Sequence, residues 1–368
     1  MEFIASKDKF LTAAQNVLRA VPSKAVRPEL SGILLTAENN SITLTGTDSE
    51  LGIKCWFEAQ ISTEGEVLLP GRYLVDVLRR LPPGQLSFRS EPTTEHVFIT
   101  SGVANFELLT LVGEFPPLEP ENQTTVASVP ELTLRSGISQ VAFAAARDGL
   151  RQLLNSVLLS LGANEMRLVA TDGHRLAVVD PLEVGEDMTR DYLVPVRCLE
   201  EVSRLFSGGE EVQITASEKQ IAFQIANALV IARLVEGKYL PYESVIPTQF
   251  SWQATVNRTE FLSALERAQV FSSEKVNAVN LKLTSAGLEV FAQSADIGRL
   301  EDLVAGEISG SELEISFNVN YLIEPLRVLA AEKVVLEFSG AESAALLSPY
   351  GSKNYRYLVM PITTRATP

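Results

Sequence analysis

A threefold internal repeat is the feature that most limits how this chain folds. Asp48, Asp172 and Asp296 lie 124 residues apart each time, and each stands between two strand-like runs. Solenoid units are about 20–50 residues long, so a period of this length is that of a whole small domain. The sequence therefore predicts three consecutive copies of one domain.

Further landmarks keep this register. One arginine in each copy lies ten residues after a matched strand-like start: Arg79, Arg204 and Arg327. A glycine–aromatic–proline pattern returns after 124 residues, first as Gly113, Phe115 and Pro117 and then as Gly237, Tyr239 and Pro241. From these markers we predict domains at residues 1–122, 127–246 and 248–368. Each is large enough to bury a core of its own.

Each copy is predicted to be an α+β domain in which two helices pack on antiparallel sheets of about eight strands. The apolar spacing predicts a helix over Asp8–Arg19 with Ser6 as its N-cap, and Asn257 is expected to cap the corresponding helix of the third copy. In the second copy we expect a strand over Glu131–Leu134 and a helix around Ile138–Ala146.

The composition is that of an ordinary globular protein, with 46% hydrophobic and 21% charged residues. No apolar run approaches the roughly 20 residues that span a bilayer, and residues 1–7 lack the pattern of a signal peptide. Cys55 and Cys198 stand in different copies and form no disulfide framework, so we expect a reducing cytoplasm. Two cysteines and two histidines leave little material for a zinc site, and no cofactor is expected.

The distribution of charge is more informative than its sum. A net charge of −15 argues against nucleic acid, because phosphate binding needs a basic surface. Positive charge nevertheless concentrates on the two helices of each copy. The second helices carry Arg72, Arg79 and Arg80; Arg197 and Arg204; Arg327 and Lys333. The first helices and the segments just after them carry Lys7, Lys9, Arg19 and Lys24; Arg147 and Arg151; Arg258, Arg267 and Lys275. These residues either form solvated helix faces, with cations favoured near helix C-termini, or share a basic surface that contacts phosphates without sequence preference.

Two motifs and the three-copy length resemble one known family over essentially the whole chain. The stretch Ala170-Thr-Asp-Gly-His-Arg-Leu-Ala-Val178 and the ending Tyr357-Leu-Val-Met-Pro361 are similar to those of the bacterial DNA polymerase III β subunits, the sliding clamps. The resemblance implies a non-catalytic processivity factor that forms a head-to-tail homodimer ring. Helices of six similar domains would line a channel for double-stranded DNA.

The resemblance also implies a cleft between the second and third domains that binds short linear peptides. Its expected partners are the DNA polymerase III alpha subunit, the clamp loader with its delta subunit, other DNA polymerases, ligase and mismatch-repair proteins. By matching position the cleft would contain Leu154, Thr171, Gly173, His174, Arg175, Leu176, Leu240, Val245, Ala344, Leu346, Val359, Met360 and Pro361. Gly173 would allow a turn that brings His174 and Arg175 to the rim.

The chain departs from the family pattern in three places. The segment Tyr239-Leu-Pro-Tyr242 places Leu240 where relatives have proline, and Ser244 replaces a residue that is often basic. The chain also continues beyond Pro361 for seven residues. These changes bear on which peptides the cleft prefers.

Matching positions further imply a DNA contact and a subunit interface. Lys24 and Arg151 correspond to DNA-facing loop positions. Phe106 of the first domain is expected to meet Val270 and Phe271 of the third domain of a second copy; ordinary core packing is the alternative for these three residues.

Other functions remain open at this point. Asp172 and His174, with Arg175 nearby, would suit acid–base catalysis, but the other copies lack the histidine and no nucleophile, phosphate-loop or metal motif accompanies them. A repeat scaffold that binds proteins and never DNA is the second alternative. A eukaryote-type clamp is disfavoured, because that family has two domains per chain.

Overall fold

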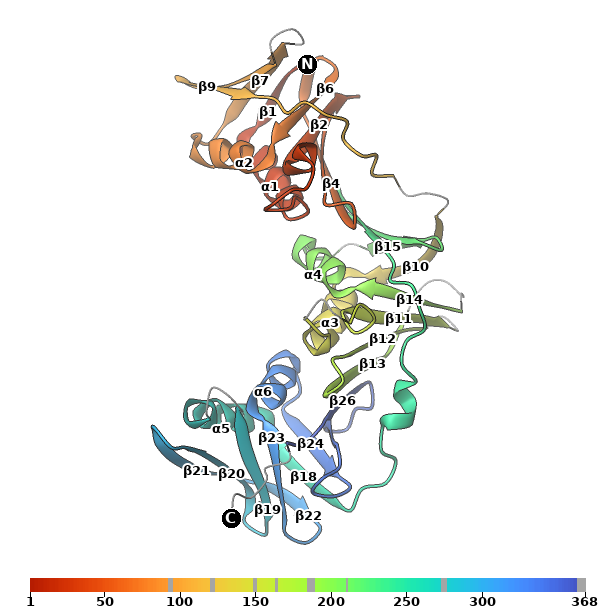
Figure 1. The fold of residues 1–368 in the computed structure, drawn as a ribbon, viewed down its shortest axis with the longest axis vertical. Helices are drawn as coiled ribbons and strands as arrows, with labels where there is room; N and C mark the ends of the chain where they lie inside the picture. Colours follow the sequence, from red (N-terminus) through yellow and green to blue (C-terminus); the bar gives the residue numbers. More distant parts are fainter. Residues whose placement is uncertain are drawn as a thin grey trace. The chain divides into compact units, whose positions relative to one another are not determined.

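The computed structural model describes residues 1–91, 95–119, 123–147, 151–162, 165–183, 189–209, 211–272 and 277–362. Within these ranges the chain repeats one order of elements three times, with two α-helices and eight or nine strands in each copy (Figure 1). No described helix is long and apolar enough to cross a bilayer.

The three copies have the following elements. The first contains β1 (Glu2–Ser6), α1 (Lys7–Leu18), β2 (Gly32–Glu38), β3 (Ser41–Thr47), β4 (Leu51–Glu58), β5 (Gln60–Thr63), β6 (Gly65–Pro70), α2 (Gly71–Arg80), β7 (Gln85–Glu91), β8 (His96–Ser101) and β9 (Ala104–Leu109). The second contains β10 (Thr124–Pro130), α3 (Glu131–Val141), β11 (Ser156–Gly162), β12 (Glu165–Thr171), β13 (Arg175–Glu183), β14 (Arg190–Pro195), α4 (Val196–Leu205), β15 (Glu211–Ala216), β16 (Gln220–Ile225) and β17 (Ala228–Arg233). The third contains β18 (Trp252–Asn257), α5 (Arg258–Phe271), β19 (Ala278–Thr284), β20 (Gly287–Ser294), β21 (Gly298–Val304), β22 (Gly306–Ser309), β23 (Leu313–Asn318), α6 (Val319–Val328), β24 (Lys333–Phe338), β25 (Ala345–Pro349) and β26 (Tyr355–Val359).

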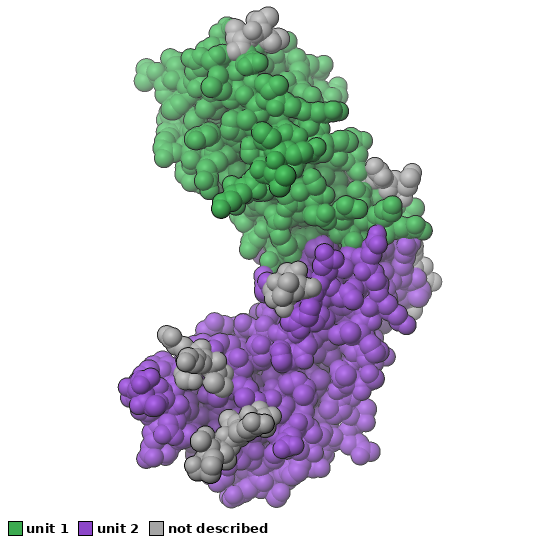
Figure 2. Space-filling model, viewed as in Figure 1, with its two compact units in different colours: residues 1–132, 197–234 green, residues 133–196, 235–368 purple. Residues whose placement is uncertain are grey.

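By its internal contacts the chain divides into two compact units, coloured in Figure 2. The first unit comprises residues 1–132 and 197–234, and the second comprises residues 133–196 and 235–368. The first holds sheets with the strand orders β5-β1-β7-β8-β9 and β10-β15-β16-β17-β4-β3-β2-β6. The second holds β14-β11-β12-β13-β26-β25-β24-β18-β22 and β21-β20-β19-β23. The second copy thus contributes strands to both units.

The copies are joined edge to edge through their sheets. At the first junction β4 pairs antiparallel with β17, with Gly52 opposite Ile231. At the second junction β13 pairs antiparallel with β26, with Leu176 opposite Leu358. By strand order β4, β13 and β21 are counterparts, and so are β17, β26 and β9. Strands β9 and β21 are the outermost strands of their sheets in the described chain.

Local sequence explains much of each copy. Asn39 and Asn40 both adopt positive φ angles, 50° and 58°, which form the tight turn between β2 and β3. Asn257 caps α5 by accepting hydrogen bonds from two backbone N–H groups, at 2.9 and 3.1 Å, as predicted. Ser6 occupies the N-cap position of α1, but its side chain makes no capping hydrogen bond.

The start of the second copy differs from the prediction. Glu131–Leu134 is not a strand but the first turn of α3, and the strand lies before it as β10. The helix predicted around Ile138–Ala146 also differs, because the α-helix ends at Val141 and a 3-10 turn follows over Ala142–Ala144. A short run of apolar residues fits both the two-residue period of a strand and the 3.6-residue period of a helix. That β10 ends at Pro130 and α3 begins after it is clear only from the strand pairing.

The three repeated aspartates are not all equivalent. Asp48 and Asp172 each accept hydrogen bonds from the backbone N–H groups two and three residues later. Asp296 instead donates its backbone N–H to the Ser294 hydroxyl. In the two other turns the corresponding donor is the residue after the aspartate: Ser49 donates to the Thr47 hydroxyl, and Gly173 donates to the Thr171 hydroxyl. The turn between β20 and β21 is one residue shorter than its two counterparts. The repeat spacing of Asp296 therefore holds in the sequence, but its hydrogen bond differs from those of Asp48 and Asp172.

Both cysteines are free and buried. Burial raises the pKa of Cys55 to about 12 and also raises the pKa of Cys198. Because the thiolate is the reactive form, burial disfavours the reactive state of both thiols. We expect the native chain to react with DTNB far more slowly than the guanidinium-unfolded chain, in which both thiols are accessible. Rapid labelling of the native chain would contradict this burial.

Candidate functional site

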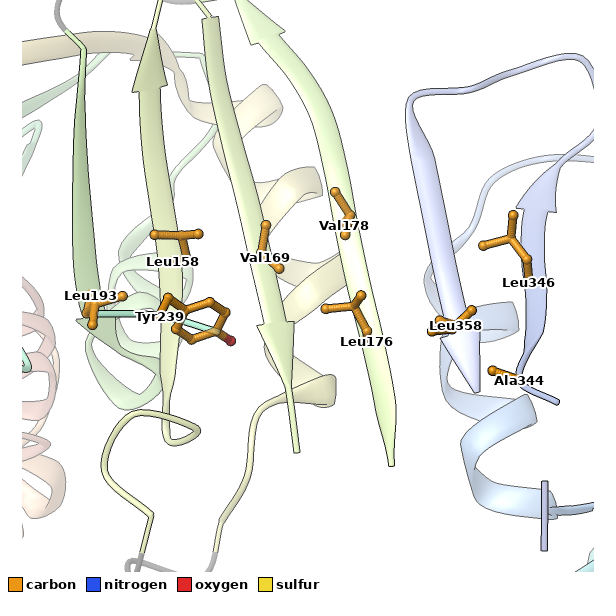
Figure 3. Packing of buried hydrophobic residues seen from close by; sticks show 9 residues of the cluster. All are labelled: Leu158, Val169, Leu176, Val178, Leu193, Tyr239, Ala344, Leu346 and Leu358. Carbon is orange, nitrogen blue, oxygen red and sulfur yellow. The ribbon is translucent and has the colours of Figure 1, made fainter. Parts of the chain in front are cut away.

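A cluster of nine buried hydrophobic residues surrounds the second junction, and we call it the junction cluster. Its side chains come from β11–β14, from β25 with the residue just before it, from β26, and from the segment that follows β17 (Figure 3). They are Leu158, Val169, Leu176, Val178, Leu193, Tyr239, Ala344, Leu346 and Leu358. The continuous sheet across β13 and β26 therefore supplies an apolar surface from two copies at once.

The linker between the second and third copies packs against this cluster. Tyr242, Ile246 and Phe250 are partly buried against it, and the buried Tyr239 belongs to it. The linker is attached to β12, because Arg167 donates hydrogen bonds to the Tyr242 hydroxyl at 3.0 Å and to the Glu243 carboxylate at 2.8 Å. Desolvation by burial raises the pKa of the Tyr239 hydroxyl, which is consistent with its apolar surroundings.

Three large hydrophobic side chains near this cluster remain accessible to solvent. Leu240 is 46% exposed, Val245 is 58% exposed and Met360 is 44% exposed. Two of them lie on the linker and one follows β26 directly. Buried aliphatic residues with exposed apolar neighbours form a surface that gains free energy by covering the apolar side chains of another molecule.

The turn between β12 and β13 positions the predicted motif beside this surface. Asp172 accepts from the backbone N–H groups of His174 at 2.8 Å and Arg175 at 3.1 Å, which closes the turn. Gly173 has a φ of +92°, a conformation that favours glycine. The His174 side chain is exposed, and its backbone carbonyl accepts from the Met360 N–H at 2.9 Å. The turn and Met360 are thereby held together.

Arg175 has a different place from the rim position expected for it. Its side chain is only 9% exposed. Its Nε donates to Asp172 at 3.0 Å and its Nη2 to the Phe143 carbonyl at 2.6 Å. The same guanidinium pairs with Glu324 of α6 and lies 4.4 Å from the Tyr321 ring centroid. Arg175 therefore links the second and third copies through a polar network centred on its buried guanidinium.

This network gives a stability prediction. Replacing Arg175 by alanine leaves Asp172 and Glu324 without their shared cation, and such a loss costs about 3 kcal/mol. Arg175→Lys should restore only part of it, because one ammonium does not reproduce the planar contacts. Thermal and urea unfolding of the variants measures the loss. A stability equal to that of the parent chain in Arg175→Ala would show that the network contributes nothing.

The other predicted peptide-site residues fall into two groups. Leu176, Ala344 and Leu346 belong to the junction cluster, while Thr171 and Val359 are buried nearby and Leu154 and Pro361 are half-buried. Sequence reasoning missed six members, namely Leu158, Val169, Val178, Leu193, Tyr239 and Leu358. Tyr239 was noted only as a repeat landmark. The available signal was the period-two spacing that puts Val178 on the same face as Leu176.

The predicted DNA-facing residues are exposed, and most lie beside carboxylates. Ion pairs join Arg79 and Arg80 to Asp76, Arg197 to Asp48, Arg204 to Glu201, and Arg327 to Glu266. Arg151 donates to the Asp172 carbonyl at 3.1 Å, while Arg72 and Lys24 are exposed. These acidic neighbours weaken the field of the arginines, so any phosphate contact made here is weak.

The predicted interface residues lie on an outermost strand of the first copy and at the end of a helix of the third. Phe106 is half-buried on β9, the outermost strand of its sheet. Val270 is exposed and Phe271 half-buried at the end of α5. At the second junction a similar pair is already formed, because the Tyr357 ring of β26 lies 5.7 Å from the Phe143 ring.

Comparison with known proteins is consistent along the whole chain. The families described as DNA polymerase III beta subunit N-terminal, central and C-terminal domain match residues 1–119, 128–241 and 243–363. The beta sliding clamp of Synechocystis sp. is 30% identical over 388 residues, covering 98% of this chain and 99% of its own. That of Bacillus subtilis is 30% identical and covers 99% of this chain and 100% of its own.

Solved structures agree with the sequence comparison. The DNA polymerase sliding clamp from Bacillus subtilis superposes with a TM-score of 0.94 at 29% identity, over 99% of both chains. The sliding clamp from Pseudomonas aeruginosa with ligand gives 0.92 at 30% identity, over 99% of this chain and 100% of that one. The chain therefore belongs to the DNA polymerase III beta subunit family, the sliding clamps, which are non-catalytic processivity factors of DNA polymerase III.

Proposed function

We propose that two copies of this chain close head to tail into a ring that encircles duplex DNA and tethers the replicative polymerase. The observation that supports closure most strongly is the edge pairing. At the first internal junction β4, the counterpart of β21, pairs with β17, the counterpart of β9. At the second internal junction β13 and β26, the next counterparts of the same two strands, pair in the same way. The strands β9 and β21 have no such partner within the described chain. If β21 of each copy pairs with β9 of the other, two heterologous interfaces close a ring.

The internal junctions also give the register of this seam, by which we mean the pairing of β21 with β9 of a second copy. Gly298 corresponds to Gly52 and Leu176, and Glu107 corresponds to Ile231 and Leu358. We therefore place Gly298 opposite Glu107. On the same register, Leu300 faces Asn105 and Arg299 faces Phe106.

The helix arginines and Lys24 would face the channel. A ring retains DNA by enclosure, so contacts weakened by neighbouring carboxylates still suffice and allow movement along the duplex. A net charge of −15 would disfavour DNA on the outer surface. A role in replication fits the predicted cytoplasmic location.

We further propose that the junction cluster and its exposed rim bind linear peptides of the polymerase III alpha subunit, the clamp loader including delta, other polymerases, ligase and mismatch-repair proteins. Leu240, Val245 and Met360 would contact apolar peptide side chains. The neutral Ser244 and the nearby Glu243 offer no cation to an acidic peptide residue. We therefore expect a weaker preference for acidic peptides here than in relatives with a basic residue at position 244.

One experiment tests the enclosure directly. After loading by the cognate clamp loader, the protein should remain on nicked circular DNA during gel filtration and leave the same DNA within minutes of its linearisation. Blocking both ends of the linear DNA with bound protein should restore retention. Equal retention on circular and open linear DNA would contradict a topological clamp.

A further inference from the structure

Two of the exposed large hydrophobic side chains outside the junction cluster occupy matching places in the repeat. Tyr73, on α2, is 66% exposed, and Ile297, in the turn before β21, is 62% exposed. They belong to different copies of the repeat and to different compact units. Each adds an apolar surface to a region that the peptide site does not use.

Their counterparts in the repeat lie at the internal junctions. Tyr73 is the third residue of α2, and the third residues of α4 and α6 are Cys198 and Tyr321. Ile297 directly precedes Gly298, whose counterparts in the first two copies are Gly52 and Leu176. The counterparts of Ile297 are therefore the residues before those two, Leu51 and Arg175. The repeat therefore supplies three corresponding pairs, of which the internal junctions contain two.

Both internal pairs are covered. At the first junction Leu51 and Cys198 are buried. At the second junction the Arg175 guanidinium lies 4.4 Å from the centroid of the Tyr321 ring. The third pair, Tyr73 and Ile297, is exposed in a single chain, because Tyr73 belongs to the first copy of the repeat and Ile297 to the third, and neither internal junction joins these two copies.

Neighbouring charges follow the same pattern. Arg197, the second residue of α4, pairs with Asp48 in the turn before β4. Arg72 is the second residue of α2, and Asp296 lies in the turn before β21. Both are exposed, and neither forms an ion pair within the described part of one copy. Opposite charges thus flank the two exposed hydrophobic residues.

We propose that Tyr73 packs against Ile297 of the partner copy across the seam, with Arg72 beside the partner's Asp296. The inference rests on the proposed ring and names a contact that selects this chain's own second copy. The second junction stacks an aromatic ring on a cation, whereas the seam joins two uncharged groups. The seam should therefore resist salt better than an interface held by ion pairs alone.

Site-specific crosslinking tests the contact. In the full-length double variant Tyr73→Cys/Ile297→Cys, mild oxidation should yield a covalent dimer on non-reducing gels, and each single variant should yield none. The native cysteines are buried and provide no competing thiol. Tyr73→Ala and Ile297→Ala should each raise the dimer Kd about tenfold or more, and the double alanine variant should be little worse than either single one.

Two controls separate this inference from the ring itself. The variant Asn105→Cys/Leu300→Cys reports pairing of β9 with β21, and Tyr350→Ala removes a tyrosine of similar exposure (62%) that has no place at the seam. Crosslinking at 105/300 without crosslinking at 73/297 would overturn the Tyr73–Ile297 contact and keep the ring. A monomeric mass without either crosslink would overturn both.

Discussion

Replacing Phe106 by aspartate should convert the protein from a dimer to a monomer. The counterparts of Phe106 on β17 and β26 are Val230 and Tyr357, and both are fully buried at the internal junctions. Phe106 is only half-buried in a single copy, so the proposed seam would complete its burial. A carboxylate at this position would be desolvated without a partner cation at each of the two seams of the ring.

We expect the dimer Kd to rise roughly 1,000-fold, because each seam loses an aromatic contact and gains a desolvated charge. Analytical ultracentrifugation should find a species near 40.1 kDa for Phe106→Asp and twice that mass for the parent chain. The matched control is Val26→Asp, which introduces the same charge at an exposed loop position. A dimer of unchanged affinity in Phe106→Asp would refute the seam.

Replacing Met360 and Leu240 together by aspartate should abolish peptide binding and leave the dimer intact. Each side chain is nearly half exposed, so the variant loses apolar contact with the peptide and keeps the fold. Leu176 is a poorer choice, because it is buried within the sheet and a charge there would disturb the second junction itself.

The probe for this prediction is a fluorescein-labelled peptide from the C-terminal region of the cognate polymerase III alpha subunit. Two lost apolar contacts and two introduced charges should weaken its binding at least 100-fold in fluorescence anisotropy. Tyr350→Asp provides a control charge on the third copy. Binding within threefold of the parent chain would place the peptide site elsewhere, while the mass of the variant tests the ring independently.

Local chemistry was readable from the sequence wherever it depends on neighbours in the chain. The repeat predicted three α+β copies, and the family matches to three consecutive domains agree with it. Asn257 was correctly expected to cap a helix, because an asparagine side chain reaches the N–H groups two and three residues ahead. The exposed Met360 and the buried Leu176 were placed near one another by the family resemblance, and β13 and β26 bring them together.

The errors arose where a residue's role depends on pairing between distant segments. Glu131–Leu134 satisfied both a strand and a helix pattern, and only the partner of β10 decided between them. The repeat spacing of Asp296 likewise does not reveal that the turn before β21 is one residue shorter, which gives Asp296 a different hydrogen bond.

The sequence alone determined the number of copies, their class, the Asn257 cap and the family, because these follow from period, side-chain type and motif. Tertiary structure decided that Arg175 is a buried link to α6 and that six further residues complete the junction cluster. It also identified β9 and β21 as the outermost strands of their sheets. The physical reason is that burial and strand register depend on which segments meet in space, and residue spacing along one chain does not specify that.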